Sequence, residues 1–218
     1  MAPTSHLAID ARVLMLQLGN TPVLANVSFE LAEGTAIGIT GANGSGKSSL
    51  LRCLATLQRP TVGYLNILGR NALAAERRSA RRDIALIGHD SGLYPTLTLR
   101  ENLKLVADML GRSTDRVDQA LDAVGLRGAA ERPFAAASKG MVRRLELARV
   151  LIQQPRLLLL DEAHAGLDAA SSDLVDQVVS RVTVGGGSAV VVSHEIDRLR
   201  PTVDQLYVIE RGILEIMT

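Results

Sequence analysis

The chain has 218 residues, of which 47% are hydrophobic and 22% charged, a composition that excludes a disordered chain. Its length can bury one full core, so we expect a single domain over 1–218. The 24 basic and 23 acidic residues nearly cancel, so we expect no nucleic-acid partner. The single cysteine, Cys53, excludes an intramolecular disulfide and lies in an apolar stretch, where we interpret it as a buried side chain.

The N-terminus lacks a basic segment followed by an apolar one, so we expect no signal peptide. The longest apolar runs, among them 157–160 and 189–192, fall far short of the ~20 residues that cross a bilayer. We therefore expect a protein that is soluble by itself and reaches a membrane only through a partner.

Two segments near the start alternate apolar and polar residues with a period of two, which predicts half-buried antiparallel strands. The predicted inward-facing residues are Leu7, Ile9, Ala11 and Val13 in the first segment and Val27, Phe29 and Leu31 in the second. A short buried strand is predicted over 36–40, followed by a helix over 48–57. Two more strands are predicted over 64–68 and 84–87.

The pattern then becomes helical. Thr98 and Glu101 have the spacing of a capping box, in which each side chain satisfies a free backbone donor of the other. The predicted helices run from there to Gly111, over 115–124 and over 138–153. No convincing strand occurs between 91 and 153, so we interpret this region as a helical insertion.

Strands and helices alternate again in the last third of the chain. The predicted elements are a strand over 157–160, a helix over 169–183, and strands over 189–192, 205–209 and 213–216. Strand, helix and strand in this order predict an α/β fold with a parallel sheet covered by helices.

A glycine-rich loop follows the strand predicted over 36–40 and opens the next helix, the context that makes this motif specific. It reads Gly41-Ala42-Asn43-Gly44-Ser45-Gly46-Lys47-Ser48 and predicts an ATP site. Backbone N–H groups of such a loop face the phosphates, the lysine reaches the β- and γ-phosphates, and the hydroxyl of Ser48 binds Mg²⁺. The predicted nucleotide-binding residues of this segment are Gly41, Asn43, Gly44, Ser45, Gly46, Lys47, Ser48 and Ser49.

Two carboxylates end the strand over 157–160. We expect Asp161 to hold Mg²⁺ through water and Glu162 to act as general base toward the attacking water. His194 follows the strand over 189–192, and the carboxyl edge of a parallel sheet is where ligands bind. We therefore predict a hydrogen bond from His194 to the γ-phosphate, with a structural histidine as the alternative.

The segment 138–149 resembles the signature helix of the ABC transporter ATPases. It reads Ser-Lys-Gly-Met and then Val-Arg-Arg-Leu-Glu-Leu-Ala-Arg, where the family has Leu-Ser-Gly-Gly-Gln and a basic helix. It precedes Asp161 in the family's order, 165–168 is similar to the loop after the acidic pair, and His194 matches the family's switch histidine. The resemblance covers nearly the whole chain. It implies a P-loop NTPase fold with a parallel RecA-like sheet core, a small antiparallel β subdomain and a helical subdomain at roughly 91–153.

The resemblance also implies partners. In this family two ATP-binding subunits hold two nucleotides head to tail between them, as a homodimer or a heterodimer. Ser138 and Gly140 of one subunit then cover the ATP of the other, and Asp168 crosses the interface. Integral membrane permease subunits are implied as well, which would place the chain in the cytoplasm, peripheral to the inner face of the cell membrane.

The chain departs from the family pattern at several positions. Ala137, Lys139 and Met141 stand where the signature usually has Leu, Gly and Gln. Either His89 or Asp90 replaces a glutamine that senses Mg²⁺, and Asp90 is the candidate for a Mg²⁺-bound water. A leucine, Leu18, occupies the place of the aromatic residue that stacks on adenine.

Residues 88–103 resemble the subunit of the haem exporter used in cytochrome c biogenesis, which implies ATP-driven haem export. Two alternatives stay open. One is a soluble ABC ATPase without a transport role, for example in Fe–S cluster assembly. The other is a P-loop kinase or GTPase, against which the helix over 138–149 and His194 argue, as does the lack of an Asn-Lys-x-Asp guanine motif.

Overall fold

The computed structural model describes residues 6–74, 77–88, 90–162, 164 and 169–217. They fall into two compact units. The first unit comprises Met1–Gly88, Pro155–Ala163 and Val179–Thr218, and the second comprises His89–Gln154 and His164–Val178. The first unit is thus assembled from three stretches of sequence, and the region predicted as a helical insertion belongs to the second.

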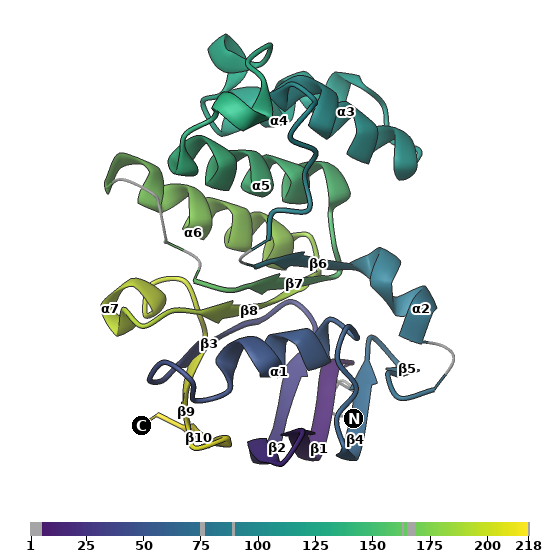
Figure 1. The fold of residues 1–218 in the computed structure, drawn as a ribbon, viewed down its shortest axis with the longest axis vertical. Coiled ribbons are helices and arrows are strands. Elements are labelled where there is room, and N and C mark those ends of the chain that lie inside the picture. The colour runs from purple at the N-terminus through teal and green to yellow at the C-terminus, as the bar shows by residue number, and fades with distance from the viewer. Residues whose placement is uncertain (1–5, 75–76, 89, 163, 165–168, 218) are drawn as a thin grey trace. The chain divides into compact units, whose positions relative to one another are not determined.

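The centre of the first unit is a parallel sheet (Figure 1). Its described strands run in the order β9 (Gln205–Glu210), β3 (Ala36–Thr40), β8 (Ser188–Val192), β7 (Leu157–Leu160) and β6 (Ile84–Ile87), and every neighbouring pair is parallel. All residues of β3, β7 and β8 are buried. Strands covered on both faces need no polar side, which explains their continuous apolar sequences. The predicted parallel sheet is confirmed.

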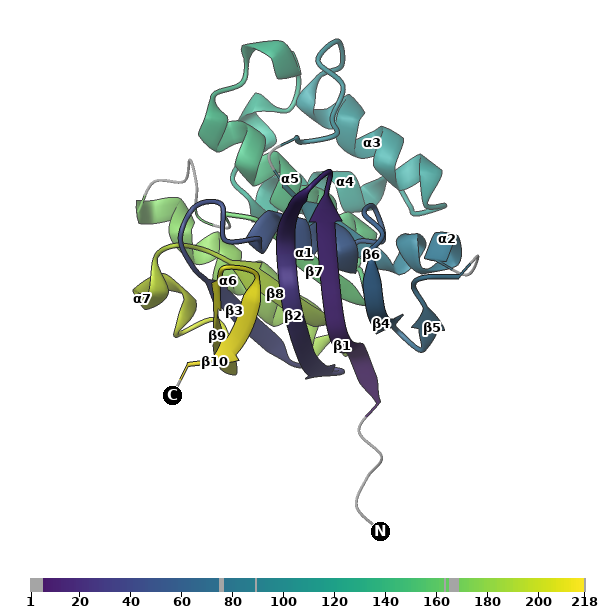
Figure 2. The same cartoon turned by 60° about the horizontal axis from the view of Figure 1, so that its bottom comes forward.

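An antiparallel part continues the same sheet (Figure 2). β10 (Ile213–Ile216) pairs antiparallel with β9 and makes a parallel bridge to β2 (Thr21–Ala32). Antiparallel pairs then follow in the order β2, β1 (Leu7–Leu18), β4 (Val62–Ile67) and β5 (Arg70–Asn71). The two predicted half-buried strands are therefore present, and both are longer than their alternating patterns.

The prediction that Val13 faces inward is wrong. Its side chain is 52% exposed and its φ is 50°. The β1–β2 register shifts between Ala11 and Leu14, so a bulge interrupts the strand. The N–H of Val13 donates to Oγ of Ser28 at 2.8 Å. Beyond the bulge the alternation changes phase, and Leu14 and Leu16 enter the core instead.

Helix α1 (Lys47–Leu54) packs its buried leucines into the core formed with the sheet. Cys53 is buried in the same cluster, as predicted, and burial raises the pKa of its thiol to about 12. The predicted end of this helix at Leu57 is wrong. Thr56 adopts a left-handed conformation with φ of 59°, which ends the helix three residues earlier.

Some short elements of the first unit carry no clear periodicity and were not predicted. These are β5, α2 (Arg77–Ala80), the 3₁₀ turn η1 (Arg81–Asp83) and α7 (Ile196–Leu199). A single helical turn is too short to show a 3.6-residue repeat, and a two-residue strand is too short to show alternation. The formation of these segments therefore depends on tertiary contacts.

The second unit is helical. Its helices α3 (Leu99–Met109), α4 (Asp115–Ala123) and α5 (Lys139–Gln153) pack against one another, with the 3₁₀ turns η2 (Arg127–Ala129) and η3 (Phe134–Ala136) between α4 and α5. The predicted capping box is confirmed. Oγ1 of Thr98 accepts from the N–H of Glu101 at 3.1 Å, and the Glu101 carboxylate accepts from the N–H of Thr98 at 2.8 Å.

Helix α6 (Ala169–Val184) contributes residues to both units. In the part of the chain that the structure describes, no helix has the length and apolar character needed to span a bilayer.

Candidate nucleotide-binding site

The predicted phosphate loop connects β3 to α1. The strand ends at Thr40, the helix begins at Lys47, and Gly46 is the N-cap with φ of 110°. A strand that runs directly into a helix start brings the free N–H groups of the first turn to the carboxyl edge of the sheet. Because Gly46 has no side chain, no side-chain cap competes with an anion for these donors.

Two glycines of the loop lie where a larger residue would collide. An added Cβ on Gly41 would clash with the carbonyl of Ile209, and one on Gly46 would lie 2.8 Å from the carbonyl oxygen of Val23. Oγ of Ser45 is buried and has no hydrogen-bond partner among the described residues. Buried hydroxyls are normally paired. A tight backbone loop with an unsatisfied hydroxyl is therefore suited to phosphate oxygens.

The side chain of Lys47 is only 6% exposed and folds back over the loop. Its Nζ donates to the carbonyl oxygens of Gly41 and Ala42, each at 2.8 Å. These two bonds compensate for the loss of water around a buried ammonium, which has three donors in all. The cation is thus already held at the loop, where a phosphate oxygen can replace a carbonyl as its partner.

Asp161 and Glu162 follow β7 at the same edge of the sheet as the loop, since β3, β8 and β7 are consecutive parallel strands. Asp161 is 6% exposed, and its N–H donates to the carbonyl of Ile87 at 2.8 Å. Glu162 has φ of 50°, a left-handed conformation that costs a non-glycine residue about 1–2 kcal/mol. Such local strain is concentrated at functional sites, where the surrounding structure maintains it.

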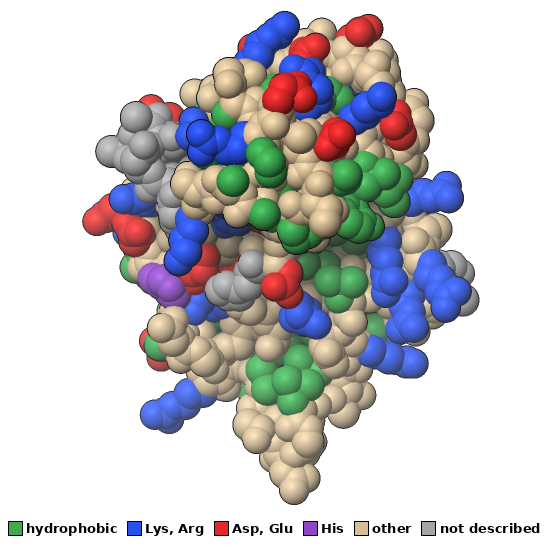
Figure 3. All heavy atoms as spheres, turned by 45° about the horizontal axis from the view of Figure 1, so that its top comes forward, with side chains coloured by type: hydrophobic (Ala, Val, Ile, Leu, Met, Phe, Trp, Pro, Cys, Tyr) green, Lys and Arg blue, Asp and Glu red, His purple; other side chains and the backbone are tan. Residues whose placement is uncertain are grey.

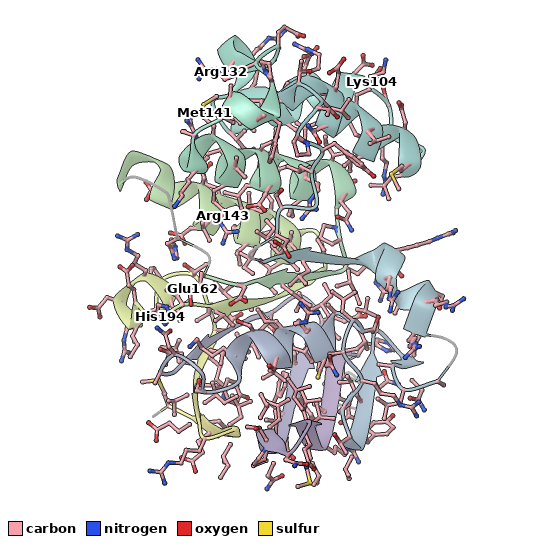
Figure 4. All side chains as sticks on the ribbon, viewed as in Figure 1. Lys104, Arg132, Met141, Arg143, Glu162 and His194 are labelled. Carbon is pink, nitrogen blue, oxygen red and sulfur yellow. The ribbon has the colours of Figure 1, made fainter. Side chains whose placement is uncertain are left out.

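His194 follows β8, the neighbouring strand, and contacts Glu162 (Figure 4). Its Nε2 lies 2.9 Å from Oε1 of the glutamate, and the two side chains are 48% and 21% exposed, respectively. An imidazole in this position orients the carboxylate, whose other oxygen can accept a proton from water. The sequence predicted both residues at this edge but not their direct contact.

The remaining residues predicted for this half of the site also belong to the first unit. Asn43 and Gly44 are exposed at the tip of the loop, and Ser48 and Ser49 are half-buried in the first turn of α1. The hydroxyl of Ser48 and the carboxylate of Asp161 provide oxygen ligands, which Mg²⁺ prefers. This ion is usually bound by only one or two protein groups and keeps several of its water ligands. The donor set present here therefore fits this ion.

The other predicted residues belong to the second unit, which contains Asp90, Ser138 and Gly140. Asp90 is exposed. His89 and Asp168 lie outside the described residues. The structure therefore brings together Gly41 to Ser49, Asp161, Glu162 and His194, and the roles of the others at the nucleotide stay predictions.

Ser138 is the N-cap of α5, as its residue type predicted. Its Oγ accepts from the N–H of Met141 at 3.2 Å. Ser138 and Lys139 are exposed at this helix start, while Gly140 is half-buried. Figure 4 shows Met141 and Arg132 close together, and Nη1 of Arg132 lies 4.0 Å from Sδ of Met141.

Farther along α5, Arg143 and Glu146 form a buried ion pair at 3.2 Å. Burial raises the pKa of the Glu146 carboxyl, although the positive charge of Arg143 opposes the shift. A pair that is this buried stabilises the fold only while both partners are present, because a single buried charge left alone is costly.

Two residues for which the sequence indicated no contact fix the segment before α3. Nη1 of Arg149 donates to the carbonyl of Ser91 at 3.1 Å. Asn102 is 1% exposed; its Oδ1 accepts from the N–H of Tyr94 at 2.7 Å, and its Nδ2 donates to the carbonyl of Tyr94 at 3.1 Å. An asparagine on the apolar face of a predicted helix is the signal that could have revealed this contact.

The loop, the acidic strand end and the parallel sheet together define a P-loop nucleotide-binding domain. A family model described as ABC transporter matches residues 24–165. The cytochrome c biogenesis ATP-binding export protein CcmA of Bordetella bronchiseptica is 41% identical over 77% of this chain and 75% of the relative. CcmA of Rhodospirillum rubrum is 39% identical over 84% of this chain and 78% of the relative. Among solved structures, a dimeric bacterial ABC transporter cassette is 26% identical and superposes with a TM-score of 0.85, covering 95% of this chain and 96% of that one.

The chain therefore belongs to the ABC transporter family and is one of its ATPase subunits. This confirms the family that the signature helix, the acidic pair and the histidine after β8 indicated in the sequence. The fold predicted from that resemblance is confirmed as well.

Proposed function

We propose that this chain is the ATP-hydrolysing subunit of a haem exporter that serves cytochrome c maturation. The two CcmA relatives support the export role. The 2.9 Å contact between Glu162 and His194 is the observation that supports hydrolysis most directly, because it orients a carboxylate at the sheet edge that carries the phosphate loop. The soluble alternative has no observation in its favour.

The phosphate loop holds the triphosphate of ATP. Backbone N–H groups of Gly41, Asn43, Gly44 and Gly46 surround the phosphate oxygens, and the hydroxyls of Ser45 and Ser49 extend this set. Lys47 exchanges its carbonyl partners for oxygens of the β- and γ-phosphates, and these bonds are stronger than the ones they replace because both partners are then charged.

Ser48 and Asp161 are the residues that would hold Mg²⁺, and Asp90 would assist by holding water bound to the ion. Mg²⁺, when bound, neutralises the charge on the phosphate oxygens. The burial of Asp161 supports its role, because a carboxylate removed from bulk water is stabilised by a nearby cation.

Glu162 accepts a proton from the water that attacks the γ-phosphorus, and the bond to the β–γ bridging oxygen breaks to give ADP and phosphate. The N–H of His194 is shared between Glu162, which it orients, and an oxygen of the terminal phosphate. The loss of that phosphate on hydrolysis leaves His194 with only Glu162 as its partner, so the pair distinguishes ATP from ADP.

A second ATP-binding subunit, identical or different, completes the site. Ser138 and Gly140 at the start of its α5 cover the γ-phosphate, and Asp168 crosses the interface. The helix N-terminus and the exposed charge of Lys139 both favour an anion there.

Membrane permease subunits supply the path for haem. We take 1–218 as one ATP-binding domain whose helical subdomain, roughly 91–153, transmits closure and opening of the ATPase dimer to these partners. The subunit then works at the cytoplasmic face of the cell membrane, held there by the permease.

The test is maturation of a c-type cytochrome in a bacterium that lacks its own exporter ATPase and expresses this chain together with haem-exporter membrane subunits from the same source organism. The wild-type chain should restore covalent haem attachment, and so should Arg181→Gln, an exposed control. Glu162→Gln should not, although it should accumulate to the same level. ATP hydrolysis by a wild-type chain that restores no cytochrome would refute haem export and leave the ATPase assignment intact.

Purification from membranes gives an independent test. Recovery of the tagged chain with a polytopic membrane protein supports the transporter subunit. Recovery with soluble proteins alone would favour the soluble ABC ATPase instead.

A further inference from the structure

The positive charge of the chain is unevenly distributed. Residues 52–83 contain seven arginines, no lysine and two acidic residues, a net charge of +5, whereas the whole chain carries only +1. The other 186 residues are therefore net negative, at −4. All of the basic segment lies in the first unit, and neither the phosphate loop nor the acidic strand end uses any of it.

Two of these arginines anchor η1, one to Thr56 just beyond the end of α1 and the other to β5. Arg81 donates through Nε to Oγ1 of Thr56 at 3.0 Å and through Nη2 to the carbonyl of the same residue at 2.8 Å. Arg70 pairs with Asp83 at 2.6 Å. The carbonyl of Arg52 accepts the N–H groups that fold the following loop back, at 2.9 and 3.0 Å. The bonds of Arg81 make 52–59 and 77–82 neighbours in the fold.

The other five arginines, which we call the arginine patch, have a different environment. They are Arg52, Arg59, Arg77, Arg78 and Arg82. Arg77 is half-buried and the rest are exposed, and within the described ranges none of their guanidinium groups forms a hydrogen bond or ion pair. Figure 3 shows basic side chains gathered around α2. Like charges gathered on one surface repel one another, so an anionic partner would lower this repulsion.

An apolar side chain lies within this charged surface. Leu57 is 52% exposed and sits in the loop between Arg52 and Arg59. A leucine flanked by arginines suits a bilayer surface, where the apolar group enters the interface and the guanidinium groups bind phosphate. Neither 52–59 nor 77–82 contains an aromatic residue, although base stacking is the usual means of holding single-stranded nucleic acid.

We propose that the arginine patch binds the anionic headgroups of a phospholipid bilayer directly, with Leu57 inserted at the interface. This affinity belongs to the chain itself and requires neither nucleotide nor permease. It would add a lipid contact to any contact with membrane subunits, and it does not depend on haem being the transported molecule.

The experiment is co-sedimentation of the purified chain with vesicles of phosphatidylcholine, with and without phosphatidylglycerol. The wild-type chain should bind the anionic vesicles, release at high salt and bind the neutral vesicles weakly. Each arginine near such a surface contributes about a fivefold increase in partitioning, so Arg59→Gln/Arg78→Gln/Arg82→Gln should weaken binding about a hundredfold. Leu57→Ser should lower the fraction of the chain that stays bound to anionic vesicles at high salt, because this residual binding depends on apolar insertion.

The matched control is Arg181→Gln/Arg200→Gln/Arg211→Gln, which removes three exposed arginines of the same unit and leaves the same net charge of −2. It should retain binding within about twofold. Thermal unfolding of both variants checks that each is folded. An equal loss in patch and control variants, or equal binding to neutral vesicles, would overturn the proposal. Binding of an RNA oligonucleotide that the patch variant loses, with no vesicle binding by the wild type, would assign the patch to nucleic acid.

Discussion

Two helix starts were predicted to meet phosphate, and they are built in opposite ways. α1 begins at Gly46, which has no side chain and a φ of 110°, and the lysine that follows is buried against the loop. α5 begins at Ser138 with extended backbone, and its hydroxyl caps the N–H of Met141. The lysine next to that cap, Lys139, is exposed.

The difference shows what a helix dipole contributes and what it does not. Both starts carry the same partial positive charge. Of the two, only the start of α1 has first-turn N–H groups that no side chain caps. It is also enclosed by the glycine-rich loop, which contributes the buried Ser45 hydroxyl and holds the Lys47 ammonium. At α5 an anion must compete with the cap of Ser138 for a donor. The first start is therefore a complete phosphate site within one subunit, whereas the second suits a phosphate that another subunit brings.

The largest expected effect is on ATP affinity, in a comparison of the lysines that follow the two helix caps. Lys47→Ala should weaken ATP binding to the isolated subunit on the order of a hundredfold or more, because charge-assisted bonds to phosphate are lost. Lys139→Ala should leave the same affinity unchanged. Isothermal titration calorimetry measures both. An equal loss in the two variants would show that the starts of α1 and α5 do not differ in the way described.

The second effect concerns turnover. Glu162→Gln removes the proton acceptor but keeps the shape of the side chain, so kcat should fall by about 10²–10⁴ while ATP still binds. ATP should then hold the variant as a dimer, detectable by light scattering. A Glu162→Gln variant that stays monomeric and hydrolyses ATP at the wild-type rate would refute both the base and the shared site.

The third effect is on the stability of the fold and concerns Gly46, the N-cap of α1. Gly46→Ala should destabilise the chain by about 3–4 kcal/mol, because the collision of the new Cβ with the carbonyl of Val23 adds to the strain of a backbone conformation that alanine avoids. Gly44→Ala is the matched control, since Gly44 has φ of 78° but open space around it, and it should cost about 1–2 kcal/mol at most. Urea unfolding compares the two, and equal costs would mean that the close approach of the backbone is unimportant.

The smallest effect is at the serine cap of α5. Ser138→Ala should cost about 1 kcal/mol of stability, which for a chain of this size is a decrease in Tm of about 2–4 °C. Thr98→Ala, at the other capped helix, should cost a similar amount. The Tm values are measured by thermal unfolding without nucleotide. A Ser138→Ala variant with unchanged Tm would mean that the cap is not formed in solution.

The sequence predicted the features that depend on local pattern. The all-buried strands β3 and β7, the loop between β3 and α1, and the Thr98 capping box each follow from a few neighbouring residues. The acidic pair after β7 could be placed at the carboxyl edge because parallel strands share that edge.

Features that depend on distant contacts could not be predicted. The bulge at Val13 is specified partly by Ser28 on the neighbouring strand. The end of α1 depends on the left-handed Thr56, which Arg81 holds from a later part of the chain. The contact of Glu162 with His194 joins residues on two strands and depends on an unusual φ that no propensity scale indicates. In each case the sequence pattern predicted that the strand or helix exists, whereas tertiary contacts determine where it ends or which residue it contacts.

The two carbonyl partners of Lys47 have a consequence for the subunit between turnovers. When product leaves, the carbonyl oxygens of Gly41 and Ala42 take the place of the phosphate oxygens, so the buried ammonium keeps hydrogen-bond partners in the empty site. A buried cation without partners would favour opening of the loop, because its desolvation would then be uncompensated. The empty subunit therefore avoids this penalty without a bound anion.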